Sequence, residues 1–231
     1  MKFVVENSSL GRIVVAPGAP LFYTTRDFDG RLSNDVARRI TQIIRDRFVI
    51  DASLTTCNQV HGARVESVAG PAAAPGEWRE CDSCDALVSE KFGTALAIKV
   101  ADCLPVTIVR EGAIANIHSG WRGAAQNITA AALDRLETDG AGAWLGPSIR
   151  VCCFEVGEEV AAQFDARFVD RSYSKPHVDL PAFTTEVLRS RGFGPDRIHD
   201  SGLCTRCEGS IFHSFRRDGS GGGRNLAIVA Q

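Results

Sequence analysis

Two side chains that could bind a metal ion or act as a nucleophile and its base lie at the ends of a predicted β-hairpin. Residues 105–110 and 113–118 are runs of β-forming residues, and Glu111-Gly112 between them predicts a tight turn. The turn would bring the outer ends of both runs together, and those ends carry Cys103 and His118. A thiol beside an imidazole is suited to zinc binding or to thiol catalysis.

His61 is a third candidate, because it follows the predicted strand 54–60 and precedes a glycine. His61, Cys103 and His118 together would give zinc three ligands and leave a fourth position open, as in catalytic zinc sites. The spacing matches no short zinc motif, so surface or packing roles stay open for these residues. Cys103 and His118 alone could instead form a nucleophile–base pair, with the imidazolium lowering the pKa of the thiol.

The chain has eight cysteines. Cys81 and Cys84 form one CxxC pair, and Cys204 and Cys207 form another. If the fold brought the two pairs together, they could make a structural zinc site with four thiolates, although packing alone would also explain them. The adjacent residues 152 and 153, also cysteines, are predicted to lie on a strand with one face buried.

Several arginines stand in glycine-rich surroundings. The segment 119–123 (SGWRG) predicts an open turn that exposes Trp121 and Arg122, an aromatic side chain able to stack on a planar ring and a cation. The segment 214–224 carries Arg216 and Arg224 and could hold phosphate, since guanidinium groups match its geometry. It lacks the GK[ST] of a Walker loop, and a solvated loop is the alternative interpretation.

The composition is that of an ordinary globular protein of 231 residues, with 44% hydrophobic and 23% charged residues. The net charge is −2 and both signs are interspersed, so neither a nucleic-acid partner nor a membrane surface is expected. The first twelve residues lack the apolar core of a signal peptide, and there is no long apolar run. We therefore expect a cytoplasmic protein with reduced cysteines.

The elements that must position these residues alternate between strands and helices. Helices are predicted at about 35–48, 123–137, 158–164 and 180–191, the first capped by Ser33 or Asn34. Strands are predicted at 13–15, 21–23, 54–60, 64–68, 84–89, 94–100, 143–145, 151–154, 197–199, 211–215 and 226–230, besides the hairpin, and 71–76 is predicted to be a loop. No repeat or change in composition divides the chain, so we expect a single α+β domain over residues 1–231.

Six segments, in order, resemble one known family, and the similarity runs from about Phe22 to the C-terminus. They are 58–62 (NQVHG), 85–88 (DALV), 101–106 (ADCLPV), 118–123 (HSGWRG), 145–157 (LGPSI…FEVG) and 214–224 (SFRRD…GR). The chain resembles the YfiH, or laccase-domain, family, long described as multicopper polyphenol oxidases.

The resemblance implies mixed β-sheets flanked by helices, a fold similar to that of cytotoxic-necrotising-factor deamidase toxins. It implies one zinc ion per chain, held by His61, Cys103 and His118. It also implies a purine nucleoside enzyme with two activities. As a transferase, the enzyme would use phosphate to cleave adenosine, inosine, guanosine or methylthioadenosine. As a hydrolase, it would deaminate adenosine. Copper fits less well, because five histidines are few for a multicopper centre.

The same resemblance assigns roles at the expected site. Water activated by zinc would attack C6 of the purine during deamination. Arg26, Arg122, Arg216 or Arg224 would hold phosphate against the ribose, with Trp121 beside the base. Asp102 and Glu155 are candidates for acid–base or supporting roles, and we favour an orienting role for Asp102, since neighbours on a strand face opposite ways.

The chain departs from the family in a shorter segment after Arg26, residues 27–35, which we expect to alter the substrate range or activity. One alternative function is a cysteine hydrolase using Cys103 and His118, acting on amide bonds such as those of peptidoglycan precursors. Another is a metal-binding or interaction protein without activity. The oligomeric state is not predicted.

Overall fold

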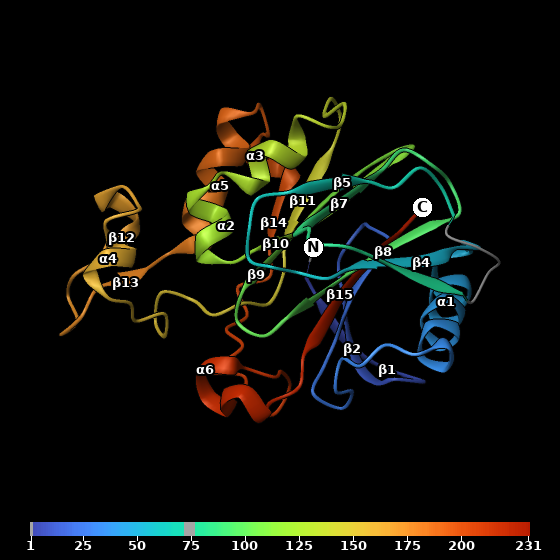
Figure 1. Ribbon diagram of the computed structural model, residues 1–231, viewed down its shortest axis with the longest axis horizontal. Coiled ribbons are helices and arrows are strands. Elements are labelled where there is room, and N and C mark those ends of the chain that lie inside the picture. The colour runs from blue at the N-terminus through green and yellow to red at the C-terminus, as the bar shows by residue number, and fades with distance from the viewer. Residues whose placement is uncertain (1, 72–76) are drawn as a thin grey trace.

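Two mixed β-sheets lie face to face, and helices cover the outer face of each sheet (Figure 1). The structure is a computed structural model that describes residues 2–71 and 77–231. Most of the predicted loop 71–76 lies outside the described residues. The α+β class predicted from the sequence is confirmed.

The first sheet combines the N-terminal strands with the C-terminal strand. Its order is β1 (Val4–Ser8), β2 (Gly11–Val15), β3 (Leu21–Thr24), β15 (Asn225–Ala230), β8 (Thr94–Val100), β4 (Ser53–Cys57) and β6 (Trp78–Cys81). β4 runs parallel to both its neighbours, and the other pairs are antiparallel.

The second sheet is built around the predicted hairpin. Its order is β14 (Ile198–Asp200), β11 (Gly142–Leu145), β9 (Leu104–Arg110), β10 (Ala113–Ser119), β7 (Ala86–Ser89) and β5 (Val65–Ser67). Pro105 of β9 lies opposite His118 of β10, so the predicted register of the hairpin is confirmed. A separate small ribbon pairs β12 (Val169–Asp170) with β13 (His177–Val178).

The inner faces of the two sheets share one apolar core. Leu96 and Ile98 of β8 meet Leu87 of β7 and Ile114 of β10, all of them fully buried. One polar side chain crosses this core: Asn116 of β10 donates to the carbonyls of Leu96, at 3.0 Å, and Ala227, at 2.9 Å.

Helices complete the outer layers. α1 (Asn34–Phe48) packs Ile40 and Ile44 against the first sheet, and the hydroxyl of Ser33 caps its N-terminus as predicted. α3 (Ile128–Leu133) and α5 (Leu180–Ser190) cover the second sheet. The remaining helices are α2 (Trp121–Ala125), α4 (Glu158–Ala161), α6 (Phe215–Asp218) and three short 3-10 turns at Ala166–Phe168, Pro195–Arg197 and Gly219–Gly221.

Three sequence predictions about elements are wrong. The helix predicted at 123–137 is two short helices, because Asn127 adopts the left-handed conformation (φ 59°) between them. Residues 151–154 form a turn instead of a strand, since the N–H groups of Cys153 and Phe154 both donate to the carbonyl of Arg150. Residues 211–215 form no strand, and Phe215 begins α6.

Other elements differ in length, because the helix predicted at 158–164 already ends at Ala161 and the strand predicted at 54–60 ends at Cys57. The strands β6, β12 and β13 were not predicted from the sequence. None of the helices in the described part of the chain has both the length and the apolarity needed to span a membrane.

Candidate functional site

His61, Cys103 and His118 converge, with one ligand atom from each lying within 4.8 Å of the others. They come from the loop after β4, the loop between β8 and β9, and the end of β10. The two imidazole rings are 4.8 Å apart and nearly perpendicular, at 85°. Two imidazoles and one thiol, brought together in this way, form a donor set that suits zinc.

Asp85, at the start of β7, fixes the orientation of His118. A carboxylate oxygen of Asp85 lies 2.8 Å from Nδ1 of His118, and the Asp85 side chain is fully buried. The carboxylate therefore accepts from Nδ1 and leaves Nε2 free for a metal ion, the usual arrangement around a ligating histidine.

The same carboxylate holds the loop that carries His61. It accepts from the backbone N–H groups of Val60, His61 and Gly62 at 3.2, 2.9 and 2.8 Å. His61 adopts a left-handed conformation with φ 60°, which is uncommon for a residue other than glycine and is held here by these bonds. Asp85 thus positions both histidines.

Cys103 lies in an irregular loop, because Asp102 before it also has a positive φ, 86°. The Asp102 carboxylate accepts from the Thr205 hydroxyl and from the Arg216 N–H, each at 2.6 Å. On the other side of Cys103 lies Gly120, where an added Cβ would come to 3.0 Å from the sulfur. The glycine therefore makes room for the thiol.

The three groups are coupled electrostatically. Burial works to raise the pKa of the Cys103 thiol, but hydrogen bonds with His118 and His61 outweigh it and lower that pKa to about 6. Burial works to lower the pKa of His118, but Asp85 and Cys103 raise it to about 9. Without a metal ion, the pair is a thiolate and an imidazolium at neutral pH.

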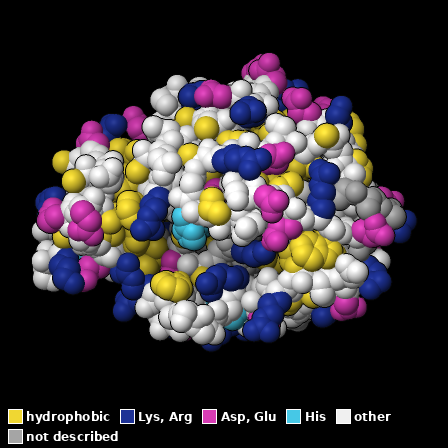
Figure 2. Space-filling view, viewed as in Figure 1, with side chains coloured by type: hydrophobic (Ala, Val, Ile, Leu, Met, Phe, Trp, Pro, Cys, Tyr) yellow, Lys and Arg dark blue, Asp and Glu magenta, His cyan; other side chains and the backbone are white. Residues whose placement is uncertain are grey.

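A cavity of about 550 Å³ opens above the three residues, large enough for a small organic ligand. Arg122, Arg216 and Arg224 line it, and Trp121 adds an aromatic wall. Figure 2 shows Lys and Arg side chains gathered around an exposed histidine on this face of the molecule. The site thus offers positive charge beside a metal-binding cluster.

The arginines of the cavity are not neutralised by carboxylates. Among the described residues, none of Arg122, Arg216 and Arg224 forms a salt bridge. The guanidinium of Arg122 lies 4.4 Å above the Trp121 ring, and that of Arg224 is 5.9 Å from the Phe215 ring. Their charge is available to an anionic ligand.

Two predicted site residues do not line this cavity. Glu155 forms a salt bridge with Lys175 at 2.8 Å. Arg26 donates to the carbonyl of Gly209. The short segment after Arg26 does approach the cavity, since the N–H of Arg224 donates to the carbonyl of Asp29 at 3.0 Å.

Asp85 is a residue of the candidate site that the sequence analysis did not assign a role, although it named the segment DALV. An aspartate directly before an apolar strand was the available signal. Gln59 and Lys99, which also line the cavity, were missed too; Gln59 is bonded to the backbone N–H and C=O of Lys99, each at 2.8 Å.

The two CxxC pairs, which the sequence left open as a possible four-thiolate site, do not meet. Cys204 and Cys207 gather with Cys152 and Cys153 instead. Cys84 and Cys57 are buried in the same core cluster, and β6 holds Cys81 beside β4. The strand predicted for residues 152 and 153 would have sent their sulfurs apart, whereas the turn brings them together.

The chain's other three histidines lie away from His61 and His118. His177 is hydrogen-bonded to the carbonyl of Val151, and His213 to the carbonyl of Phe28. The ring of His199 lies 4.9 Å from that of Trp144, tilted by 33°. A multicopper centre requires more imidazoles than the two at this site, so the donor set favours a single metal ion.

A family model described as multi-copper polyphenol oxidoreductase laccase matches residues 30–231. The chain belongs to this family. The family resemblance seen in the sequence is therefore confirmed.

Relatives in the laccase family carry the names of nucleoside enzymes. One called adenosine deaminase RL5, from an unknown prokaryotic organism, is 32% identical, with 98% of this chain and 99% of the relative covered. One called purine nucleoside phosphorylase, from Deinococcus radiodurans, is 35% identical, with 74% of this chain and 68% of the relative covered.

Solved structures share the fold. The hypothetical protein YfiH of Bacillus licheniformis superimposes with a TM-score of 0.81 at 21% identity, covering 98% of this chain and 97% of that one. YlmD of Geobacillus stearothermophilus gives a TM-score of 0.76 at 21% identity, covering 95% and 96%.

Proposed function

We propose that this chain is a zinc-dependent purine nucleoside enzyme. It would deaminate adenosine to inosine and ammonia. With phosphate, it would convert adenosine, inosine, guanosine or methylthioadenosine to the free base and the 1-phosphate of the sugar. The names of the relatives support both reactions.

One observation carries the proposal: three convergent side chains, His61, Cys103 and His118, lie at a cavity that is lined with arginines forming no salt bridge within the described part of the chain. Zinc held by three protein ligands supplies a Lewis acid with one free coordination position. We favour zinc over copper because the relatives are named for nucleoside deamination and phosphorolysis, reactions that a Lewis acid can assist and that involve no change of oxidation state.

The arginines give the chain a way to bind phosphate. Arg122 and Arg216 present cationic groups that form no salt bridge among the described residues, and guanidinium hydrogen bonds match the geometry of phosphate. Trp121 beside Arg122 offers a flat apolar face against which a purine can lie. Nucleoside and phosphate can therefore be held next to each other.

Asp102 is a positioning residue in this proposal. Its two carboxylate oxygens are already engaged by Thr205 and by the backbone of Arg216, so it ties the Cys103 loop to the start of α6. That role agrees with the orienting role expected from the sequence. Arg26 and Glu155 lie outside the cavity and have no part in the proposed chemistry.

Product analysis tests the proposal. Zinc-loaded protein is incubated with adenosine, with and without phosphate, and the products are separated by chromatography. We expect inosine without phosphate, and adenine with ribose 1-phosphate when phosphate is present. If zinc-loaded protein leaves adenosine unchanged under both conditions, the proposal is wrong.

A cysteine hydrolase is the second candidate, and the chain Cys103–His118–Asp85 favours it. A thiolate beside an imidazolium that a buried carboxylate orients is the arrangement of a cysteine nucleophile and its base. This reaction requires the thiol to be free of metal. Purified protein that lacks zinc, and in which alkylation of Cys103 abolishes hydrolysis of an amide substrate, would favour it.

The proposed partners are small molecules, namely a purine nucleoside and phosphate. The cytoplasmic location and the extent of one domain over residues 1–231 stay predictions from the sequence.

A further inference from the structure

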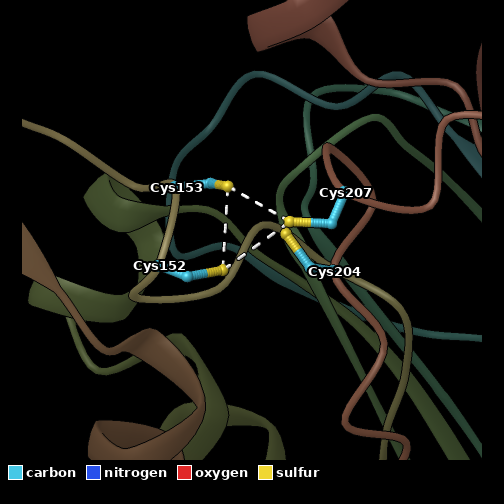
Figure 3. Close-up of side chains that lie close together, drawn as sticks. All are labelled: Cys152, Cys153, Cys204 and Cys207. Carbon is cyan, nitrogen blue, oxygen red and sulfur yellow. Dashed lines mark hydrogen bonds between the residues drawn. The ribbon is translucent and has the colours of Figure 1, made fainter.

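Four cysteines form a second cluster outside the cavity. The sulfurs of Cys152, Cys153, Cys204 and Cys207 all lie within 4.8 Å of one another, and Figure 3 shows them pointing toward a common centre from two segments of the chain. We infer that this cluster is a structural zinc site with four thiolate ligands, distinct from the site at His61, Cys103 and His118.

The spacing of the sulfurs matches one tetrahedral ion. Cys153 and Cys207 are 3.4 Å apart, Cys152 and Cys153 are 3.7 Å apart, and Cys152 and Cys207 are 3.9 Å apart. With a Zn–S distance of about 2.3 Å, the edge of a tetrahedron of sulfurs is about 3.8 Å. The four thiols are free, and a multi-iron cluster would hold its sulfurs farther apart.

Both segments are built to present sulfur. The turn at Arg150–Cys153 directs two consecutive cysteines to one side, and the CxxC segment forms a second turn in which Glu208 N–H donates to the carbonyl of Cys204 at 2.9 Å. A parallel bridge between Ser148 and Cys204 fixes the two turns side by side. The cluster is therefore held by backbone contacts that do not depend on a metal ion.

The surroundings suit the negative charge of thiolates. Burial works to raise the pKa of the Cys204 thiol, but the backbone N–H groups of Cys207, Arg150 and Arg206 outweigh it and lower that pKa. The guanidinium of Arg206 lies 3.5 Å from the sulfur of Cys153. Such contacts around metal ligands stabilise the charged site, and two of the four cysteines, Cys152 and Cys207, are exposed and give an ion access.

The zinc would fasten two segments that also support the cavity. Ile149, just before the first turn, donates its N–H to the carbonyl of Asp102 at 2.9 Å. Thr205, in the second turn, donates its hydroxyl to the Asp102 carboxylate. The ion therefore lies behind Asp102 and Cys103 and would hold both turns against them.

Metal content of purified full-length variants tests the inference. Wild type grown with zinc is expected to hold two zinc ions per chain and Cys207→Ser one. His118→Ala is also expected to hold one, because it keeps the four thiolates. Cys81→Ser, in a cysteine outside the cluster, is the matched control and should match wild type. Equal zinc content in Cys207→Ser and wild type overturns the inference.

A second measurement applies even if Cys207→Ser does not fold. Wild-type protein is alkylated with iodoacetamide before and after zinc removal, and modified cysteines are identified by mass spectrometry. We expect the exposed Cys152 and Cys207 to be protected in the zinc-loaded protein and modified at least tenfold faster after chelation. Equal modification of Cys152 and Cys207 in both states overturns the inference. So does a disulfide between cysteines of the cluster in protein that was purified under reducing conditions and loaded with zinc.

Discussion

At the scale of single residues, Asp85 does the most to organise the site. Its buried carboxylate accepts four hydrogen bonds, three from the backbone around His61 and one from His118. One side chain therefore sets the positions of two of the three proposed metal ligands. Hydrogen bonds of this kind typically change metal affinity 10- to 100-fold.

Asp85→Asn is expected to weaken zinc binding at this site by about 10- to 100-fold. An amide accepts fewer hydrogen bonds than a carboxylate and does not favour the same orientation of His118. Competition with a metal indicator measures the change. Asp82→Asn, in an exposed residue of the same loop, is the control and should bind as wild type does. An unchanged affinity in Asp85→Asn would show that Asp85 does not orient the ligands.

Cys103 is expected to react as a thiolate in metal-free protein. Since its folded pKa is lowered to about 6, the thiolate should be fully formed above that pH and lost as the pH falls through about 6. The rate of iodoacetamide modification at Cys103, followed by mass spectrometry against pH, should be half-maximal near 6. A midpoint near the ordinary thiol value of 9.0 would contradict the coupling with the histidines.

At the scale of elements, the hairpin was predictable and the loops were not. Two runs of β-forming residues and the Glu111-Gly112 turn were enough to predict β9 and β10, and the register of this hairpin placed His118 correctly. The left-handed conformations of His61 and Asp102 left no signal, because neither residue is glycine. They depend on hydrogen bonds with residues distant in sequence: the His61 N–H donates to the Asp85 carboxylate, and the Thr205 hydroxyl donates to the Asp102 carboxylate.

The two turns that carry the cysteine cluster, at residues 150–153 and 204–207, could not be predicted from the sequence either. Cys204-x-x-Cys207 was recognised as a possible half-site, but its partner could not be chosen from spacing. The residues at 151–154 have β-forming side chains, and hydrogen bonds to Arg150 override that propensity. The four sulfurs therefore meet only through the tertiary fold.

Asn116 joins the two sheets, and its replacement is expected to lower stability. Asn116→Ala leaves two buried carbonyls, of Leu96 and Ala227, without this donor, and should cost about 1–3 kcal/mol of unfolding free energy. Urea unfolding measures the loss. Asn7→Ala on the exposed edge strand β1 is the control, with a change within about 0.5 kcal/mol. Equal stability of Asn116→Ala and wild type would show that the bridge contributes nothing.

At the scale of the whole molecule, the site is assembled from segments across most of the chain. The three candidate ligands and the arginines come from loops, a strand end and short helices at positions between 61 and 224, supported by both sheets. A metal ion that binds only the folded arrangement must therefore stabilise the entire fold. A zinc ion in the cysteine cluster would likewise join two parts of the fold, the turns at 150–153 and 204–207.

Removing zinc is expected to lower the melting temperature. Free zinc at about 100 times its dissociation constant adds about 2.7 kcal/mol for each site. For a chain of this size, that corresponds to a shift of about 5–10 °C per site. Thermal scans with zinc and with a chelator measure it. Identical melting temperatures under the two conditions would contradict metal binding by the folded chain.

The most direct test of the central claim is adenosine turnover, measured together with zinc content, in wild type and His118→Ala. If the site at His61, Cys103 and His118 performs the chemistry, zinc-loaded wild type turns over adenosine. His118→Ala then loses the zinc of that site and at least 1,000-fold in activity, on the order of the loss of a main catalytic group. Full turnover by His118→Ala without that zinc would contradict the account.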